Sequence, residues 1–413
     1  MRRSDASLPA PYPKRGLNKG SLMKLFMYMR TLATGRGDTE RAASELANEM
    51  SRRGHKVYLA YAGDSSGKPA YDMSSSVGLI PLERGPGMMD QACDIASRLS
   101  PHILLGFYSS PLVFESVYLH YHTEIPLILQ ECSSPERIIR KNWTQPYEST
   151  EIAALEREAA TAAACRIQVA IPEYEDFFPD YIKANVRSFP HAYQIPHGLN
   201  QQSKADRKRI ISISDDTSNK NIMVLLQAFK LINSSCPDYD IHLFRTIPHG
   251  EEAINEIKQF IAENRLSERI FLNDPVDDLH AEYAKSQIHV TTSLSESLPR
   301  CVAEAMLHGI PTVSFADSTG AGALVKHGVN GLLASPDDRI HNLAAELEKL
   351  MHDNELRADL GAEALKGSAA FDPDSVYRQW ESLFEEAAAY GGDQRRLISE
   401  QMDINKDRAL RAL

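Results

Sequence analysis

The sequence predicts an α/β protein built from two doubly wound domains that face each other across a central cleft. Its 413 residues are too many for one ordinary hydrophobic core, so two domains are the expectation. In two separate stretches, beginning at residue 23 and near residue 208, apolar runs of strand length alternate with segments of helical periodicity. Proline, glycine and a polar run at residues 195–209 separate these stretches, as is typical of a domain junction.

The first stretch has the order strand, turn, helix, strand. Residues 23–31 are an apolar run, and a glycine-containing turn at residues 33–39 follows. Residues 40–53 carry apolar side chains at helical spacing, and Gly54 suits the position just after a helix. Residues 55–60 predict the next strand, which completes a βαβ unit. Further strands are predicted at residues 103–107, 118–122 (which include His120 and His122) and 127–129.

The second stretch repeats this alternation. Residues 210–214 predict a strand, a polar loop follows, and residues 222–232 have a helical pattern. Later strands are predicted at residues 241–244, 270–272, 289–291 and 312–315. Because doubly wound domains bind ligands where the carboxyl ends of their strands face a crevice, we expect the functional site between the two domains.

These patterns divide the chain into five segments. They are a flexible leader at residues 1–22, a first Rossmann-like domain at 23–200, a second one at 207–373, a helix at 374–390 and a charged tail at 391–413.

Composition narrows the class of partner and the compartment. The formal net charge of −11 argues against a protein that wraps nucleic acid, because phosphates require a basic surface. No run approaches the roughly 20 apolar residues that are needed to cross a bilayer. The five cysteines form no CxxC or Cys/His pattern, so neither a disulfide framework nor a zinc site is expected. A reducing cytoplasm is the expected compartment.

The most specific stretch lies at residues 292–313. Glu296 stands in a loop after a predicted strand, and Pro299 suits the first turn of a helix, where its missing N–H costs nothing. The unpaired amides of residues 297–301 would then point toward the cleft, ready to bind hydroxyl or phosphate oxygens. Glu304 follows Glu296 by eight residues, or about two helical turns, so the two carboxylates would contact different parts of one extended ligand.

This stretch resembles the signature of the family 4 retaining glycosyltransferases, which have the GT-B fold. The similarity lies in Glu296, seven intervening residues, Glu304 and the glycine-isoleucine-proline-threonine-valine run at 309–313. The glycine loop around residues 35–37 and the junction at 195–200 are similar as well, and the resemblance covers about residues 23–390. It implies two Rossmann-like domains facing a cleft, with the C-terminal helix crossing back to the first domain.

The resemblance implies transfer of a sugar, with retention, from a nucleotide-diphosphate sugar such as a UDP- or GDP-sugar, which is a substrate and not a cofactor. It assigns Glu296 to the donor sugar, Glu304 to the ribose and Lys220 to the departing diphosphate, whose charge a preorganised cation neutralises. The other expected donor-binding residues are Ser297, Leu298, Pro299, Arg300, Gly35 and Gly37. The first domain would bind the acceptor, a saccharide, a lipid-linked or another hydroxyl compound, in the synthesis of a bacterial polysaccharide, a glycolipid or a related glycoconjugate.

The chain departs from the family pattern at three positions. Asp215 stands where an arginine is usual, Ser214 where a glycine is usual, and Cys132 where a histidine is usual. A carboxylate at position 215 would repel a diphosphate. Arg245, Arg36 and Arg300 are candidates for the missing positive charge. We favour Arg245, because it ends a predicted strand of the second domain and would face the cleft. Glu131, Cys132 and Arg36 are the expected acceptor-side residues.

Two acidic pairs in the sequence are candidate ligands for a metal ion. Asp-x-Asp occurs at residues 238–240 and 372–374, and such pairs can hold a divalent ion on a diphosphate. Both lie beside prolines in predicted turns, so we expect turn residues and a reaction that is independent of metal.

Simpler interpretations remain open for several residues. Glu296 and Glu304 could be solvated acids on a helix, and Lys220 a surface lysine. The basic, partly apolar segment at 137–143 is either a peripheral contact with the inner face of the membrane or a solvated helix face. Two other functions also fit the pattern: a nucleotide-sugar epimerase or hydrolase, and a non-catalytic partner subunit with a degraded site.

Overall fold

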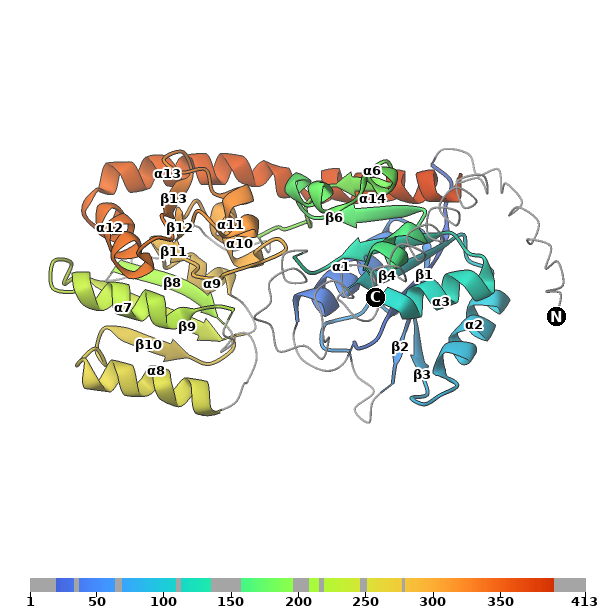
Figure 1. Cartoon of the computed structure of the whole chain (residues 1–413), viewed down its shortest axis with the longest axis horizontal. Helices are drawn as coiled ribbons and strands as arrows, with labels where there is room; N and C mark the ends of the chain where they lie inside the picture. Colours follow the sequence, from blue (N-terminus) through green and yellow to red (C-terminus); the bar gives the residue numbers. More distant parts are fainter. Residues whose placement is uncertain are drawn as a thin grey trace, which may run out of the picture.

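A computed structural model gives the structure of the chain. It describes residues 20–32, 37–63, 69–108, 113–134, 157–195, 208–214, 219–245, 251–276 and 279–389. Two α/β domains lie side by side along the long axis of the molecule, and a nearly continuous helical layer runs over both (Figure 1). None of the helices in the described ranges is long and apolar enough to cross a membrane.

The first domain is a wound α/β sheet. Its elements are β1 (Lys24–Met29), α1 (Asp38–Arg52), β2 (Lys56–Ala62), β3 (Gly78–Leu82), α2 (Met88–Leu99), β4 (Ile103–Tyr108), α3 (Val113–Thr123), β5 (Leu127–Glu131), β6 (Arg166–Val169), η1 (Pro172–Phe177), α6 (Asp180–Lys183) and β7 (Val186–Ser188). Over the described residues the strands pair in the order β3-β2-β1-β4-β5-β6-β7, all parallel. The order reverses between β1 and β4, and such a switch point opens a crevice at the carboxyl ends of the strands.

The second domain has the same design. Its elements are β8 (Lys208–Ser214), α7 (Ile222–Ile232), β9 (Tyr239–Arg245), α8 (Glu251–Glu263), β10 (Ile270–Asn273), α9 (His280–Tyr283), β11 (Ile288–Val290), α10 (Arg300–Leu307), β12 (Thr312–Phe315), α11 (Thr319–Leu324), β13 (Gly331–Ala334), α12 (Arg339–His352), α13 (Asn354–Gly367) and η2 (Ser368–Phe371). In the described part of the chain the parallel strand order is β10-β9-β8-β11-β12-β13. The switch point therefore lies between β8 and β11.

The last described helix, α14 (Pro373–Ala388), returns to the first domain (Figure 1). Its apolar face packs into the core formed by β1, β2 and α1, and Trp380 meets Phe189 edge to face at 5.2 Å. The carboxylate of Glu386 accepts hydrogen bonds from Arg166 and Arg187 at 2.9 and 2.7 Å. The C-terminal helix is thus a structural part of the first domain.

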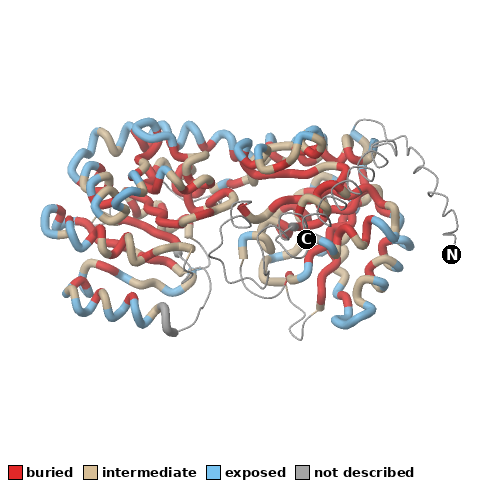
Figure 2. The backbone as a smooth tube through the Cα atoms, in the orientation of Figure 1, coloured by how far each residue is buried: buried red, intermediate tan, exposed pale blue. Residues whose placement is uncertain are grey.

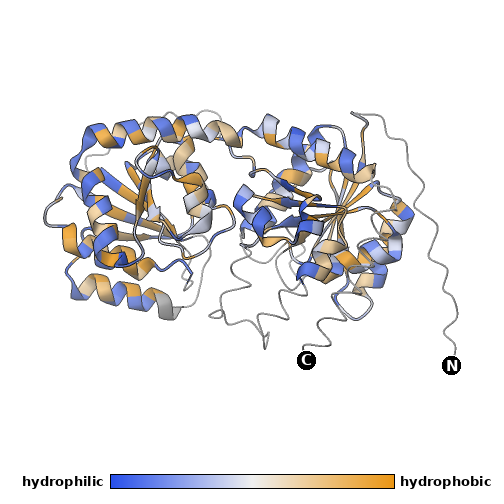
Figure 3. Cartoon of the chain, turned by 45° about the horizontal axis from the view of Figure 1, so that its top comes forward, coloured by the Kyte–Doolittle hydropathy of each residue, from blue (hydrophilic) through white to orange (hydrophobic). Residues whose placement is uncertain are grey.

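Burial follows the two sheets. The strands are largely buried while the outer helical turns are exposed (Figure 2). The helices alternate hydrophobic and hydrophilic positions, as expected where one face covers a sheet and the other meets water (Figure 3). In α1 the buried positions are Ala43, Ser44, Leu46, Ala47 and Met50.

Two local predictions can be compared with the structure. Gly54, just after the C-cap of α1, has φ +94°, as the predicted helix stop requires. The strand predicted at 118–122 is wrong, because these residues lie in α3, where the His120 ring bonds the carbonyl of Ile125 at 2.7 Å. Apolar alternation over five residues did not distinguish this short helix from a strand.

Candidate active site

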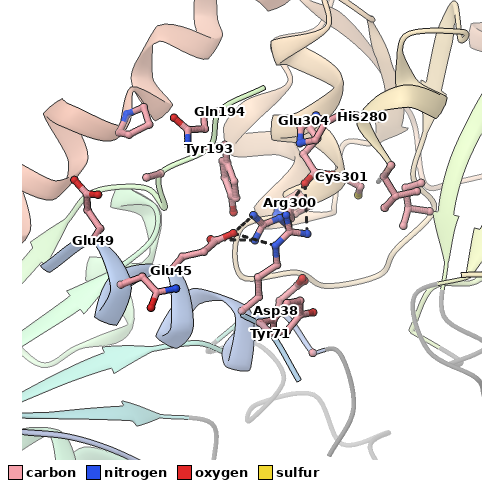
Figure 4. A pocket seen from close by; sticks show the side chains of 18 of the residues that line it. Asp38, Glu45, Glu49, Tyr71, Tyr193, Gln194, His280, Arg300, Cys301 and Glu304 are labelled. Atoms are coloured by element: carbon pink, nitrogen blue, oxygen red, sulfur yellow. Dashed lines mark hydrogen bonds and ion pairs between the residues drawn. The ribbon is translucent and has the colours of Figure 1, made fainter. Parts of the chain in front are cut away.

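A cavity of about 1020 Å³ lies between the two domains. The first domain contributes side chains from α1, and the second contributes them from α10, from the ends of β8 and β9 and from loops that follow its strands. Figure 4 shows Arg300 between Glu45 and Glu304, with other lining side chains around them. Residues lining both sides include Gly37, Asp38, Arg41, Glu45, Tyr193, Lys220, Arg245, His280, Glu296, Pro299, Arg300, Cys301 and Glu304. The predicted position of the site, between the domains, therefore coincides with a real cavity.

Lys220 and Glu296 meet on the wall formed by the second domain. Nζ of Lys220 lies 2.5 Å from Oε1 of Glu296, and the two side chains are 18% and 16% exposed. Lys220 precedes α7 and Glu296 follows β11, so the adjacency of β8 and β11 in the sheet brings them together. A cation and an anion at this distance bind each other until a charged ligand competes for one of them.

The loop that carries Glu296 is held from several sides. The Asn219 side chain bonds the backbone carbonyl and amide of Ser295 at 2.9 and 3.2 Å. The Tyr174 hydroxyl, from the first domain, donates to the Glu296 carbonyl. A Cβ at position 320 would clash with that same carbonyl, so a glycine is needed there. The Glu296 backbone is therefore fixed by contacts from both domains.

Helix α10 presents Glu304 to the cavity. Its carboxylate is 4% exposed and accepts a 2.9 Å hydrogen bond from Nε of Arg300, one turn earlier. Pro299 is the N-cap residue, so the helix begins one residue later than the first-turn proline would place it. The correction is small, because a proline just ahead of a helix also leaves the first-turn amides free of intrahelical bonds.

Arg300 connects the two walls of the cavity. Its Nη2 donates to Oε1 of Glu45 in α1 at 2.8 Å, and Nη1 lies 3.4 Å from Oε2 of the same carboxylate (Figure 4). Arg41 approaches the same cluster, with Nε 3.0 Å from Glu45 and Nη1 4.0 Å from Glu304. The Arg300 guanidinium is thus engaged by two carboxylates, which leaves it poorly placed as a phosphate ligand.

Arg245 lies at the end of β9 and lines the cavity, as predicted. Its guanidinium pairs with Asp274, whose side chain is 88% exposed. An exposed partner held mainly by charge is readily exchanged for a stronger anion. Lys220 and Arg245 together give the second domain two cations on one cavity.

A buried histidine, His289, lies near enough to Lys220 to feel its positive charge. His289 on β11 is fully buried, and its Nδ1 lies 3.0 Å from the Thr312 hydroxyl. Burial, assisted by the positive charge of Lys220, lowers the pKa of His289 to about 3. The ring is therefore neutral at physiological pH and adds no charge to the site.

Several predicted residues do not reach the cavity. Ser297 and Leu298 belong to the loop that carries Glu296, but they do not line the cavity. Glu131 is 1% exposed and bonds Arg157 at 2.8 and 2.9 Å, so its carboxylate holds the first domain together. Cys132 donates its thiol to the Gln130 carbonyl at 3.6 Å, likewise away from the cavity. Gly35, Arg36, Asp215, segment 137–143 and tail 391–413 lie outside the described residues.

The two acidic pairs have structural partners. Asp240 pairs with Arg269 at 3.0 Å, and Asp238 pairs with Lys208 at 3.0 Å. Asp372 caps α14 and Asp374 pairs with Arg53 at 2.6 Å. Within the described ranges no three His, Cys, Asp or Glu side chains form a group that could hold a metal ion.

Comparison with known proteins agrees with this geometry. Residues 199–367 match the family described as glycosyl transferases group 1. The matched region covers most of the second domain and includes Lys220, Glu296 and Glu304. Over 88% of the chain, the structure matches that of Anabaena HepE in complex with UDP and glucose, with a TM-score of 0.71, 17% identity and 99% of that chain covered. The chain has the GT-B fold of glycosyltransferases. The predicted fold class is confirmed.

Two curated relatives differ in how much of their length this GT-B chain matches. An exopolysaccharide phosphotransferase of Streptomyces coelicolor is 28% identical over 204 residues, which is 49% of this chain and only 21% of that protein. An uncharacterized glycosyltransferase of Haemophilus influenzae is 20% identical over 84% of this chain and 96% of its own. The second match extends over both GT-B domains.

The sequence patterns did not predict that α1 and Tyr193 contribute to the cavity. Glu45 and Arg41 form a pair four residues apart, a spacing common on solvated helices, so nothing in the sequence marked them. Tyr193 lies just before the domain junction, and its ring stacks under Arg300 at 4.9 Å. Only the approach of the second domain makes these residues part of the cavity.

Proposed function

We propose that this GT-B chain is a retaining glycosyltransferase that moves a hexose from a nucleotide-diphosphate sugar to a hydroxyl acceptor. The observation that carries the proposal is the meeting of Lys220 and Glu296, at 2.5 Å, on one wall of an interdomain cavity that Glu304 also lines. A cation, a sugar-facing acid and a ribose-facing acid are the three groups that an extended donor requires.

In this proposal the diphosphate competes with Glu296 for Lys220. When the donor enters, the ammonium turns to the phosphate oxygens and Glu296 becomes free to accept hydrogen bonds from the sugar hydroxyls. Arg245 exchanges Asp274 for the diphosphate and supplies the charge that Asp215 cannot. Fixed cations of this kind stabilise the charge that develops as the phosphate leaves.

Glu304 would accept hydrogen bonds from the ribose hydroxyls. Retention would follow from attack on the same face that the diphosphate leaves: the acceptor oxygen forms the new bond to the anomeric carbon, and the departing phosphate takes its proton. Closure of the two domains would exclude water and limit hydrolysis of the donor.

We propose that the acceptor is a saccharide or a lipid-linked hydroxyl compound in bacterial polysaccharide or glycolipid synthesis. Support comes from the partial match to a protein whose name refers to an exopolysaccharide. UDP-glucose is the first donor to test, because the structurally similar HepE was crystallised with UDP and glucose.

The experiment begins with a thermal-shift screen of UDP-, GDP-, ADP- and TDP-sugars, since a ligand that binds only the folded state raises Tm. The donor found is then incubated with and without saccharide acceptors, and the anomeric configuration of the product is read by NMR. A product with the donor's configuration supports the proposal. A changed or free sugar without acceptor indicates an epimerase or hydrolase instead, and no nucleotide binding at all indicates a non-catalytic subunit.

A further inference from the structure

A charge network joins the two domains beside Glu304. Arg300 makes a two-pronged contact with Glu45 of α1, at 2.8 and 3.4 Å, and a 2.9 Å bond to Glu304 of its own helix. A single guanidinium therefore bridges a carboxylate of the first domain and a carboxylate of the second (Figure 4). The planar fork of arginine suits this geometry, because each pair of N–H groups has a fixed direction.

The hinge region supports Arg300 on another side. The guanidinium carbon lies 4.9 Å from the centre of the Tyr193 ring. Tyr193 is 5% exposed, and its amide donates to the Phe371 carbonyl at 3.1 Å. Tyr193 precedes the junction between the domains and Phe371 precedes the returning helix, so Arg300 packs beside both crossings of the chain between the domains.

Arg300 is the nearer of the two guanidinium groups beside Glu304, at 2.9 Å, whereas Arg41 lies at 4.0 Å. The Glu304 side chain is 4% exposed, so little water is available to solvate its charge. Burial alone lowers the pKa of Arg300, but Glu45 and Glu304 outweigh that effect and raise it, so the guanidinium stays charged. A buried carboxylate whose fixed charged partner shifts must reorient or lose solvation.

We propose that Glu45 is a positioning residue for the nucleotide donor: through Arg300 it holds the Glu304 carboxylate in the orientation that receives a ribose, and it does so only when the domains are closed. The inference rests on the ribose-binding role proposed for Glu304. Opening of the cavity separates Glu45 from Arg300 and frees the guanidinium to move. Nucleotide binding and domain closure therefore favour each other by linkage.

The alternative is that Glu45–Arg300 is an interdomain ion pair with no influence on the ligand. Exposed pairs contribute little, and the Glu45 side chain is 36% exposed. Its partner Arg300 is only 14% exposed and is shared with Glu304, which distinguishes this pair from an isolated surface contact. The two interpretations predict different nucleotide affinities for a variant that lacks the Glu45 charge.

The test is calorimetric titration of the full chain with UDP, GDP and ADP, using the tightest binder for the variants. Glu45→Gln keeps the shape of the side chain and removes its charge, and we expect nucleotide affinity to fall about tenfold. Arg300→Lys keeps the charge without the fork and should weaken binding similarly. The matched control is Glu381→Gln, which removes the charge from a 3.2 Å ion pair between Arg53 and the returning helix; Glu381 does not line the cavity. Its affinity should equal that of wild type, and circular dichroism checks the fold of each variant.

A double-mutant cycle shows whether the effect passes through Glu304. In a Glu304→Ala background, Glu45→Gln should cause no further loss, because the carboxylate that it positions is gone. Fully additive losses, or wild-type affinity in Glu45→Gln, would overturn the inference while leaving the proposed function intact. If wild type binds none of the three nucleotides, both the proposed function and this inference are wrong.

Discussion

Nζ of Lys220 lies 2.5 Å from Oε1 of Glu296, although 76 positions separate the two residues in the chain. The pair lies in the cavity between the domains, where each partner is less than one-fifth exposed. Without a ligand the cation and the acid satisfy each other. Any anionic ligand must exchange this contact, so both residues are expected to affect the same step of the reaction.

Loss of either partner should lower turnover sharply. We expect Lys220→Ala and Glu296→Ala to reduce kcat about 10²-fold or more, because a preorganised group that stabilises developing charge is removed. Lys220→Arg should recover part of the loss. Lys285→Ala removes a lysine that pairs with Glu282 outside the cavity and serves as the control. The measurement is the initial rate of sugar transfer by each variant. Turnover within twofold of wild type in both alanine variants would refute the mechanism.

Arg245 should contribute to binding of the diphosphate and not of the nucleoside. Removal of its guanidinium by Arg245→Ala is expected to weaken UDP binding about tenfold, the magnitude of a hydrogen-bonded charge contact. Uridine binding should not change. Calorimetry with both ligands measures the difference.

Two further variants separate this effect from general electrostatics. Asp274→Ala removes the exposed partner of Arg245 and should leave UDP affinity equal or higher, because competition is lost. Lys258→Ala removes an exposed charge on α8 and should have no effect. Equal weakening of UDP and uridine in Arg245→Ala would remove Arg245 from the phosphate site.

Stability should fall on mild acidification because of buried His289. Its pKa is about 3 in the folded chain, against 6.5 for the free side chain. Between these values the unfolded state binds a proton that the folded state does not, so stability rises with pH there, by at most about 1.4 kcal/mol per pH unit for one group. His289→Gln should flatten the dependence of Tm on pH between about 4 and 6.5. An unaltered slope would show that His289 does not contribute, and exposed His122→Gln is the control.

Chelation should leave sugar transfer intact. Lys220 and Arg245 line the cavity, and both can neutralise a diphosphate without a divalent ion. We expect initial rates in EDTA to match those in added Mg²⁺ or Mn²⁺. Loss of activity in EDTA that either ion restores would contradict this expectation.

The architecture could be predicted because it depends on local patterns. Buried strands give continuous apolar runs, and helices that cover a sheet give apolar positions at helical spacing. The helix predicted at 222–232 is α7, Ile222–Ile232, and the one predicted at 374–390 is α14, Pro373–Ala388. The strand predicted at 118–122 was wrong because a short helix and a short strand can have the same apolar content.

The site was only partly predictable from sequence. Glu296, Glu304 and Lys220 lie in motifs with recognisable spacing, and Arg245 ends a strand; all four line the cavity. Glu131 was expected on the acceptor side, yet its carboxylate is buried against Arg157. Its strand is central in the sheet, and a position there does not reveal whether a side chain faces the cleft or the core.

The sequence by itself determined the two sheets and the motif that carries the acids, because these depend on residues close together in the chain. Only the tertiary structure decided which charges meet. Arg300 and Glu45 are 255 positions apart, and their contact exists because the two domains close on each other. An ion pair requires a distance of a few ångströms, and across two domains that distance is set by the packing of whole sheets and of the returning helix.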